Sequence, residues 1–234
     1  MQRIVMAALL AGALAGLAAF ALHLWQTTPL ILHAEVYEDG SAPAAAGHSH
    51  APAPSAPAAQ AQKAEPEKIT DDLGRHVLTL LADVVIAVGF GFLLVGAMAL
   101  SGRGADWRRG IVWGLCGYAA FYVAPSLGLA PELPGMVAAE LGARQAWWLG
   151  TAAAAVVALG LIFFTQGALW KVLAALLLVA PQAIGAPHPV MEAGNVPAEL
   201  AAQFATASLV VTGLFWMVLG GLGGYFYQRF APNA

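Results

Sequence analysis

Histidine and carboxylate side chains gather in this sequence where long apolar runs come to an end. The segment WQTTPLILHAEVYEDG, residues 25–40, follows one such run and holds the candidate ligands His33, Glu35 and Glu38. Imidazole nitrogens and carboxylate oxygens suit cobalt, nickel and zinc, whereas soft metals prefer thiolates. The chain has one cysteine, Cys116, inside an apolar run. The segment therefore predicts capture of a divalent cation, and an acidic membrane-flanking segment without an ion role is the alternative.

A row of polar residues follows at helical spacing further along the chain. Asp72, His76, Thr79 and Asp83 are separated by four, three and four residues, which places them on one face of a helix. The row continues into an apolar run, where an ionisable residue is costly and indicates function by default. Asp83 is therefore interpreted as a transient binding site for a cation or a proton that crosses the membrane. A carboxyl group bonded to a neighbouring helix is the alternative.

A third candidate ligand, His188, lies between Pro187 and Pro189 in the segment APQAIGAPHP. A histidine held between two prolines has less conformational entropy to lose when it binds metal. Pro181 lacks a backbone donor and is expected to kink the preceding helix. Kinked backbone at membrane depth is found where it is packed in protein or lines a wet cavity. An interfacial histidine that ends the helix is the alternative.

The elements that carry these residues are long apolar stretches. Of the 234 residues, 60% are hydrophobic and 10% charged, against about 25% charged in soluble domains, and the mean hydropathy is +0.73. Six stretches are long enough to cross a bilayer core of about 30 Å: 4–25, 77–100, 111–129, 146–164, 168–186 and 204–227. Pro29 is expected to break the first helix, and Gln166 and Gly167 should join the fourth and fifth in a tight hairpin. The sequence predicts an all-α polytopic membrane bundle of about six transmembrane helices, with five as the alternative.

Positive charges set the expected orientation of the bundle. With the N-terminus inside, six lysines and arginines lie in short inner segments and four in the outer ones, as the positive-inside rule requires. Eleven of the thirteen carboxylates then lie outside. Both termini are therefore predicted to be cytoplasmic. The first helix is expected to be retained, with cleavage as a signal peptide as the alternative.

Three parts follow from the order of these stretches. They are the first transmembrane helix and its outer break at 1–32, an outside loop at 33–76, and a five-helix membrane bundle at 77–234. Within the loop, residues 41–62 are rich in alanine and proline and are expected to be disordered. His48 and His50 in this segment could capture metal weakly or be incidental to a solvated tether.

The sequence lacks the common signatures of enzymes. It has no GxxxxGK[ST] phosphate loop, no HExxH and no GxSxG. The chain is therefore predicted not to be an enzyme, and no cofactor is expected. Its net charge is −3 and it has no basic block, so nucleic acid is not an expected partner. The lipid bilayer and a divalent metal ion are the partners that its composition and its side chains indicate.

Several segments, taken in order, carry a family resemblance. They are AALLAGALAGLAAF and TPLILHAEVYE near the start, GLCGYAAFYVAPSLGLAPELPG and ARQAWWLGTA in the middle, and IGAPHP further on. Together they resemble the CbtA family, the probable cobalt transporter subunit. The resemblance implies a multi-pass component of cobalt uptake in a bacterial inner membrane. It also implies a small histidine-bearing one-helix partner of the CbtB type and a link to cobalamin synthesis.

The resemblance carries over five polar residues by position: Glu35, Glu38, Glu132, Arg144 and His188. Arg144 is expected to pair with Glu140, four residues away, or with Glu132.

One working hypothesis joins the residues and the resemblance. Four side chains are expected to capture a hydrated divalent cation at the outer mouth: His33, Glu35, Glu38 and His188. Three more are expected to pass it inward: His76, Thr79 and Asp83. The ion is expected to be Co²⁺, with Ni²⁺ as the alternative because their ligand preferences overlap. A non-transporting metal sensor, or a scaffold subunit for a partner membrane protein, is the alternative function, since Asp83 alone is ionisable deep in the membrane.

Overall fold

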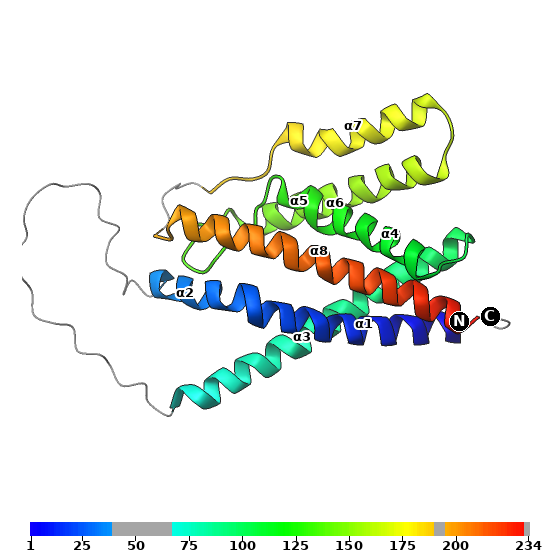
Figure 1. Ribbon diagram of the computed structural model, residues 1–234. Helices are drawn as coiled ribbons and strands as arrows, with labels where there is room; N and C mark the ends of the chain where they lie inside the picture. Colours follow the sequence, from blue (N-terminus) through cyan, green and yellow to red (C-terminus); the bar gives the residue numbers. More distant parts are fainter. Residues whose placement is uncertain (39–66, 190–194, 232–234) are drawn as a thin grey trace, which may run out of the picture.

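The computed structural model describes residues 1–38, 67–189 and 195–231, and every regular element in these ranges is a helix (Figure 1). The predicted all-α fold is therefore confirmed. The low-complexity segment 41–62, with His48 and His50, lies outside the described residues.

Within the described ranges, six helical passes run between the two ends of the bundle. The first consists of α1 (Gln2–Leu22), the π turn η1 (His23–Thr27) and α2 (Thr28–Glu38), and the second is α3 (Glu67–Ser101). The third consists of α4 (Trp107–Tyr118), the π turn η2 (Ala119–Val123) and α5 (Ala124–Ser126). The last three are α6 (Leu141–Phe164), α7 (Ala168–Ile184) and α8 (Ala198–Arg229). α1 begins and α8 ends at the same end of the bundle, as an even number of passes requires (Figure 1).

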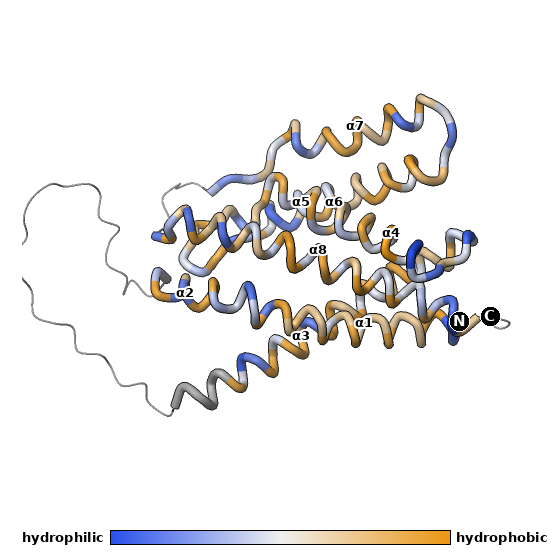
Figure 2. The backbone as a smooth tube through the Cα atoms, in the orientation of Figure 1, coloured by the Kyte–Doolittle hydropathy of each residue, from blue (hydrophilic) through white to orange (hydrophobic). Residues whose placement is uncertain are grey.

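Length and composition make most of these helices suitable for a membrane. Four are long and apolar enough to cross one: Gln2–Tyr37, Leu73–Ser101, Leu141–Phe164 and Ala198–Arg229. α7 is apolar but shorter, with 17 residues, and the third pass is divided by its π turn. Polar residues gather toward the two ends of the bundle, and apolar residues cover the stretches between (Figure 2). These features confirm the predicted membrane bundle, whereas the cytoplasmic placement of the termini stays a prediction.

Glycine lets the central helices approach one another closely. A Cβ atom added at Gly16 would lie 2.6 Å from the Cα of Val84, where α1 packs against α3. A Cβ atom added at Gly110 would lie 2.2 Å from the carbonyl oxygen of Gly220, where α4 packs against α8. Larger residues at these positions would force the backbones apart. Small residues therefore set the spacing of α1, α3, α4 and α8.

Aromatic side chains fill the space between these closely packed helices. Trp216 of α8 is 3% exposed, and its ring centroid lies 4.9 Å from that of Phe90 in α3 and 5.9 Å from that of Phe121 in η2. Such ring pairs add to the stabilisation that comes from burial alone. Trp216 therefore ties three passes together at the centre of the bundle.

The α6–α7 hairpin lies at the edge of the bundle (Figure 1). Three residues join the two helices, and Gly167 in this link has φ 104°, which glycine adopts without strain. The tight hairpin is as predicted. Pro181 lies inside α7, one turn before the helix ends at Ile184. Val172 and Leu176 of α7 are 57% and 60% exposed, as suits a helix with one face toward lipid.

Each of the two π turns ends two residues before a proline. η1 ends at Thr27, before Pro29, and η2 ends at Val123, before Pro125. Proline has no N–H, and its ring collides with the carbonyl one turn earlier. Widening that turn by one residue accommodates the ring and lets the helix continue. The predicted break of the first helix at Pro29 is therefore wrong, because the helix continues to Glu38.

Candidate functional site

The π turn η1 holds His23 on the side of the first pass that faces α3. The backbone N–H of Thr28 donates to the His23 carbonyl, which is the wide register of a π turn. The Thr27 hydroxyl donates to the same carbonyl at 3.3 Å, and Thr27 is only 6% exposed. Two donors on one carbonyl therefore fix the backbone from which the His23 side chain projects.

The His23 ring contacts Asp83 of α3. Its Nδ1 lies 2.9 Å from Asp83 Oδ2, and the two side chains are 33% and 13% exposed. Helical side chains lean toward the N-terminus of their own helix, so His23 reaches back along α1 to the level of Asp83. The contact is a hydrogen bond when the imidazole is neutral and an ion pair when it is protonated.

Asp83 lies well inside the apolar part of α3. The apolar run begins at Val77, and the distance along the helix from residue 77 to residue 83 is about 9 Å. A carboxylate at this depth is costly unless it has a partner. The sequence predicted the intramembrane place of Asp83 but missed His23 as its partner. The signal was available, because His23 is the one titratable side chain in the stretch 4–25.

The rest of the predicted polar row continues from Asp83 toward the N-terminus of α3. The Thr79 hydroxyl donates to the Arg75 carbonyl at 2.9 Å, and His76 is half-buried. Arg75 Nη1 lies 3.1 Å from Glu35 Oε1 of α2, and both side chains are partly exposed. The candidate site is therefore a polar strip between the first two passes, from Glu35 of α2 to Asp83 within the membrane-spanning part of α3.

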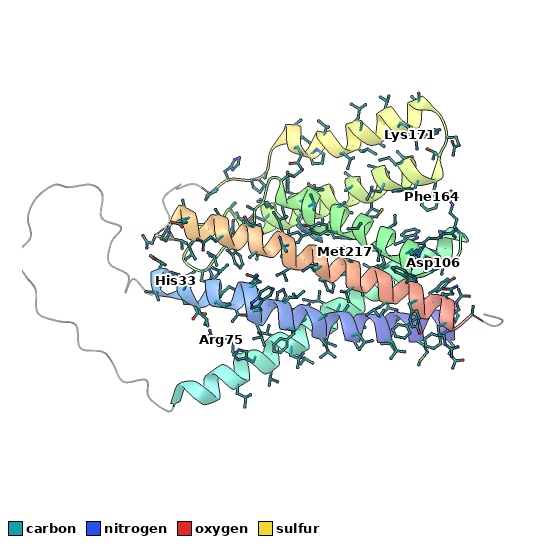
Figure 3. The ribbon with its side chains drawn as sticks, in the orientation of Figure 1. His33, Arg75, Asp106, Phe164, Lys171 and Met217 are labelled. Carbon is teal, nitrogen blue, oxygen red and sulfur yellow. The ribbon has the colours of Figure 1, made fainter. Side chains whose placement is uncertain are left out.

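The other predicted ligands do not join this strip. His33 lies midway along α2 and is exposed (Figure 3), with 6.3 Å between its ring centroid and that of Tyr37. His188 is exposed in the segment after α7, a helix that packs along α6. The side chains of Glu38 and Asp72 lie outside the described part of the structure. Among the described residues, no group of three or more His, Cys, Asp and Glu could hold a metal ion.

A second ion pair joins the loop before α6 to that helix. Arg144 Nη2 lies 2.6 Å from Glu132 Oε2, and the side chains are 30% and 26% exposed. Of the two expected partners of Arg144, the structure selects Glu132. Trp147, one turn further along α6, packs over Gly128, where an added Cβ would lie 2.5 Å from the Trp147 ring. This pair therefore holds the loop against α6.

Glu140, in contrast, caps the N-terminus of α6. The backbone N–H groups of Gly142 and Ala143 donate to its carboxylate at 2.8 and 2.7 Å, and these bonds lower the pKa of Glu140. A lowered carboxyl pKa stabilises the fold above the pKa of the unfolded chain, and this contribution is lost as the pH falls through the folded pKa.

We expect a ¹³C carboxyl titration in detergent to place the pKa of Glu140 below the ordinary glutamate value. Gly142→Pro, which removes one donor at a position that tolerates proline, should raise that pKa, and an unchanged value would contradict the capping role.

Comparison with known proteins finds a family model that matches nearly the whole chain. A family model described as "Probable cobalt transporter subunit (CbtA)" matches residues 1–228, nearly the full length. The match includes the His23–Asp83 contact and both π turns. Comparison with curated proteins and with solved structures finds no significant match.

Proposed function

Because the chain belongs to the CbtA family of probable cobalt transporter subunits, we propose that it is the membrane component through which a bacterial cell takes up cobalt. The proposed route begins at the outer end of α2 and follows the polar strip inward to His23 and Asp83. The observation that supports it is the 2.9 Å contact between these two side chains within the membrane-spanning helices. Uptake, rather than export, is part of this proposal and is tested by the transport assay below.

The chemistry of the strip suits a borderline divalent cation. His23 offers an imidazole nitrogen and Asp83 a carboxylate oxygen, which are ligands that Co²⁺ and Ni²⁺ accept. The negative charge of Asp83 offsets part of the cost of removing water from the ion. Neither ligand is a thiolate, so the ion can leave as well as enter, which conduction requires. At the outer end, Arg75 neutralises Glu35 while no cation is present.

The same strip supports the proposal that the chain works as a subunit. Two side chains do not complete the coordination of a divalent cation, and the described residues contain no larger group of metal-binding side chains. The remaining ligands are proposed to be water and side chains of a partner. A small histidine-bearing membrane helix of the CbtB type would supply imidazole, the same ligand type that His23 provides.

Uptake of radiolabelled cobalt tests the proposal directly. Cells without their own cobalt importers would express the chain alone, the CbtB-type partner alone, or both, and membrane insertion would be checked in each case. We expect accumulation well above background with both proteins, reduced by excess unlabelled nickel. Accumulation with the chain alone would show a permease that needs no partner. No accumulation in any case, despite insertion, would contradict transport and favour a metal sensor or scaffold.

A further inference from the structure

A second feature of the bundle lies away from the polar strip. An apolar groove of about 1030 Å³ lies between α3 and α6, with α4 and Trp216 of α8 as its floor. Large side chains on its walls are open to the surroundings: Leu93 and Leu100 of α3 are 60% and 91% exposed, and Phe163 of α6 is 46% exposed. The groove is therefore an apolar channel on the outside of the bundle, where lipid meets the protein.

Two arginines line one end of this groove. Arg103 Nη1 donates to the Phe163 carbonyl at 3.1 Å, and its guanidinium lies 4.6 Å from the ring centroid of Phe164. Arg109 Nη1 donates to the Arg103 carbonyl at 2.8 Å. In the described part of the chain, neither guanidinium has a carboxylate partner. Each keeps donors for a further acceptor, because a guanidinium carries five.

The surroundings of the two arginines leave an excess of positive charge. Arg108 adds a third positive charge, and Asp106 is the one carboxylate in the segment from residue 103 to residue 109. Asp106 caps α4 by accepting the backbone N–H of Arg109 at 2.8 Å. The four charged side chains of the segment sum to +2, so the end of the groove attracts an anion.

The dimensions of the groove match one leaflet of a bilayer. Its α3 wall runs from Phe90 to Leu100, which is about 15 Å at 1.5 Å per residue and equals half of a hydrocarbon core of ~30 Å. Trp107 is 50% exposed beside the arginines, as expected of an aromatic residue at the membrane–water interface. Asp106 and Phe164, which flank this region, lie at the same end of the bundle (Figure 3).

We propose that this groove binds one anionic phospholipid of the leaflet on this side. The acyl chains lie over α4 between α3 and α6, and Arg103 and Arg109 hold the headgroup phosphate. An acyl chain alone explains the apolar walls but not the two arginines without carboxylate partners. The charge at the end of the groove selects a lipid with net negative charge over a zwitterionic lipid of the same chains.

Native mass spectrometry of the purified full chain in mild detergent tests the site. Phosphatidylglycerol and phosphatidylcholine with identical acyl chains would be added at equal concentration. We expect one tightly retained phosphatidylglycerol per chain, preferred by about 25-fold, since each of the two arginines near the headgroup contributes about fivefold. Arg103→Gln with Arg109→Gln should remove the preference. Arg108→Gln should lower it far less, because Arg108 adds only to the local charge: it stacks 5.2 Å from the Trp107 ring and does not line the groove.

A second pair of variants tests the groove itself. An added Cβ at Gly160, which lines the groove, or at Gly150, on the same helix outside it, meets nothing within 4 Å. Gly160→Phe should fill the groove and lower retention of both lipids, whereas Gly150→Phe should not. Glycerol 3-phosphate, a headgroup without chains, should not displace bound lipid. Equal retention of the two lipids by the unaltered chain, or a preference that survives loss of both arginines, would overturn the proposal.

Discussion

Asp83→Asn is expected to lower cobalt uptake by at least about tenfold while the bundle stays folded. Asparagine keeps the size of aspartate and still accepts a hydrogen bond from His23, so the contact of α1 with α3 survives. It removes the negative charge that a divalent cation needs when it loses water. Even the loss of a partner outside the first coordination shell of a metal typically costs 10–100-fold in affinity or activity. His23→Gln should act in the same direction, because it removes the imidazole nitrogen.

The measurement is the initial rate of radiolabelled cobalt uptake, divided by the amount of inserted protein. Glu199→Gln is the matched control, since Glu199 is an exposed carboxylate in the first turn of α8 and bonds Gln203 at 3.3 Å. It should transport as the unaltered chain does. Thermal unfolding in detergent would be followed for all three variants, to separate loss of transport from loss of structure.

A purely structural role for the pair makes a different prediction. If His23 and Asp83 only hold α1 to α3, the variants should transport normally per inserted molecule, whether or not they unfold at lower temperature. Such a result would contradict the proposed route. A double variant that is no more impaired in uptake than either single variant would show that the two side chains act as one site.

The six passes could be predicted because their signal is local. Each is a long apolar run, and the tight hairpin at Gly167 follows from the few residues between two of them. The effect of Pro29 could not be predicted in the same way. Its ring requires that the preceding turn changes, but either a break or a π turn meets that requirement. Packing of α2 around Ala34 and Tyr37 against the start of α8 favours the continuous helix.

The candidate site was only partly predictable for a related reason. Spacing within one helix places Thr79 and Asp83 on one face, and the structure supports that part. The partner of Asp83 depends on how α1 crosses α3. That crossing is set by the glycines of α1, which lie far from Asp83 in the sequence. The predicted meeting of His33 with His188 rested on both being expected on the same side of the membrane, at the outer mouth. The fold places them on different pairs of helices, α2 with α8 and α7 with α6.

Gly220→Ala is expected to destabilise the bundle although alanine favours helices. A Cβ at Gly220 would lie 2.3 Å from the Gly110 carbonyl oxygen and 2.8 Å from the Cα of Gly114. These are backbone atoms of α4, which cannot rotate away as a side chain could. α8 must therefore move off α4, and overpacking of this kind typically costs about 1–3 kcal/mol. The expected result is a lower midpoint of thermal unfolding in detergent, with a further fall for Gly220→Leu.

The neighbouring glycine provides the matched control for this prediction. A Cβ at Gly221 would lie 3.4 Å from Cγ1 of Ile111, an ordinary contact with a flexible side chain. Because glycine costs a helix about 1 kcal/mol relative to alanine, Gly221→Ala should leave the midpoint unchanged or raise it. The two substitutions add the same methyl group to the same helix and differ in the face that receives it. Equal midpoints for Gly220→Ala and Gly221→Ala would mean that α4 and α8 are not in backbone contact, and that the spacing of the central helices is set elsewhere.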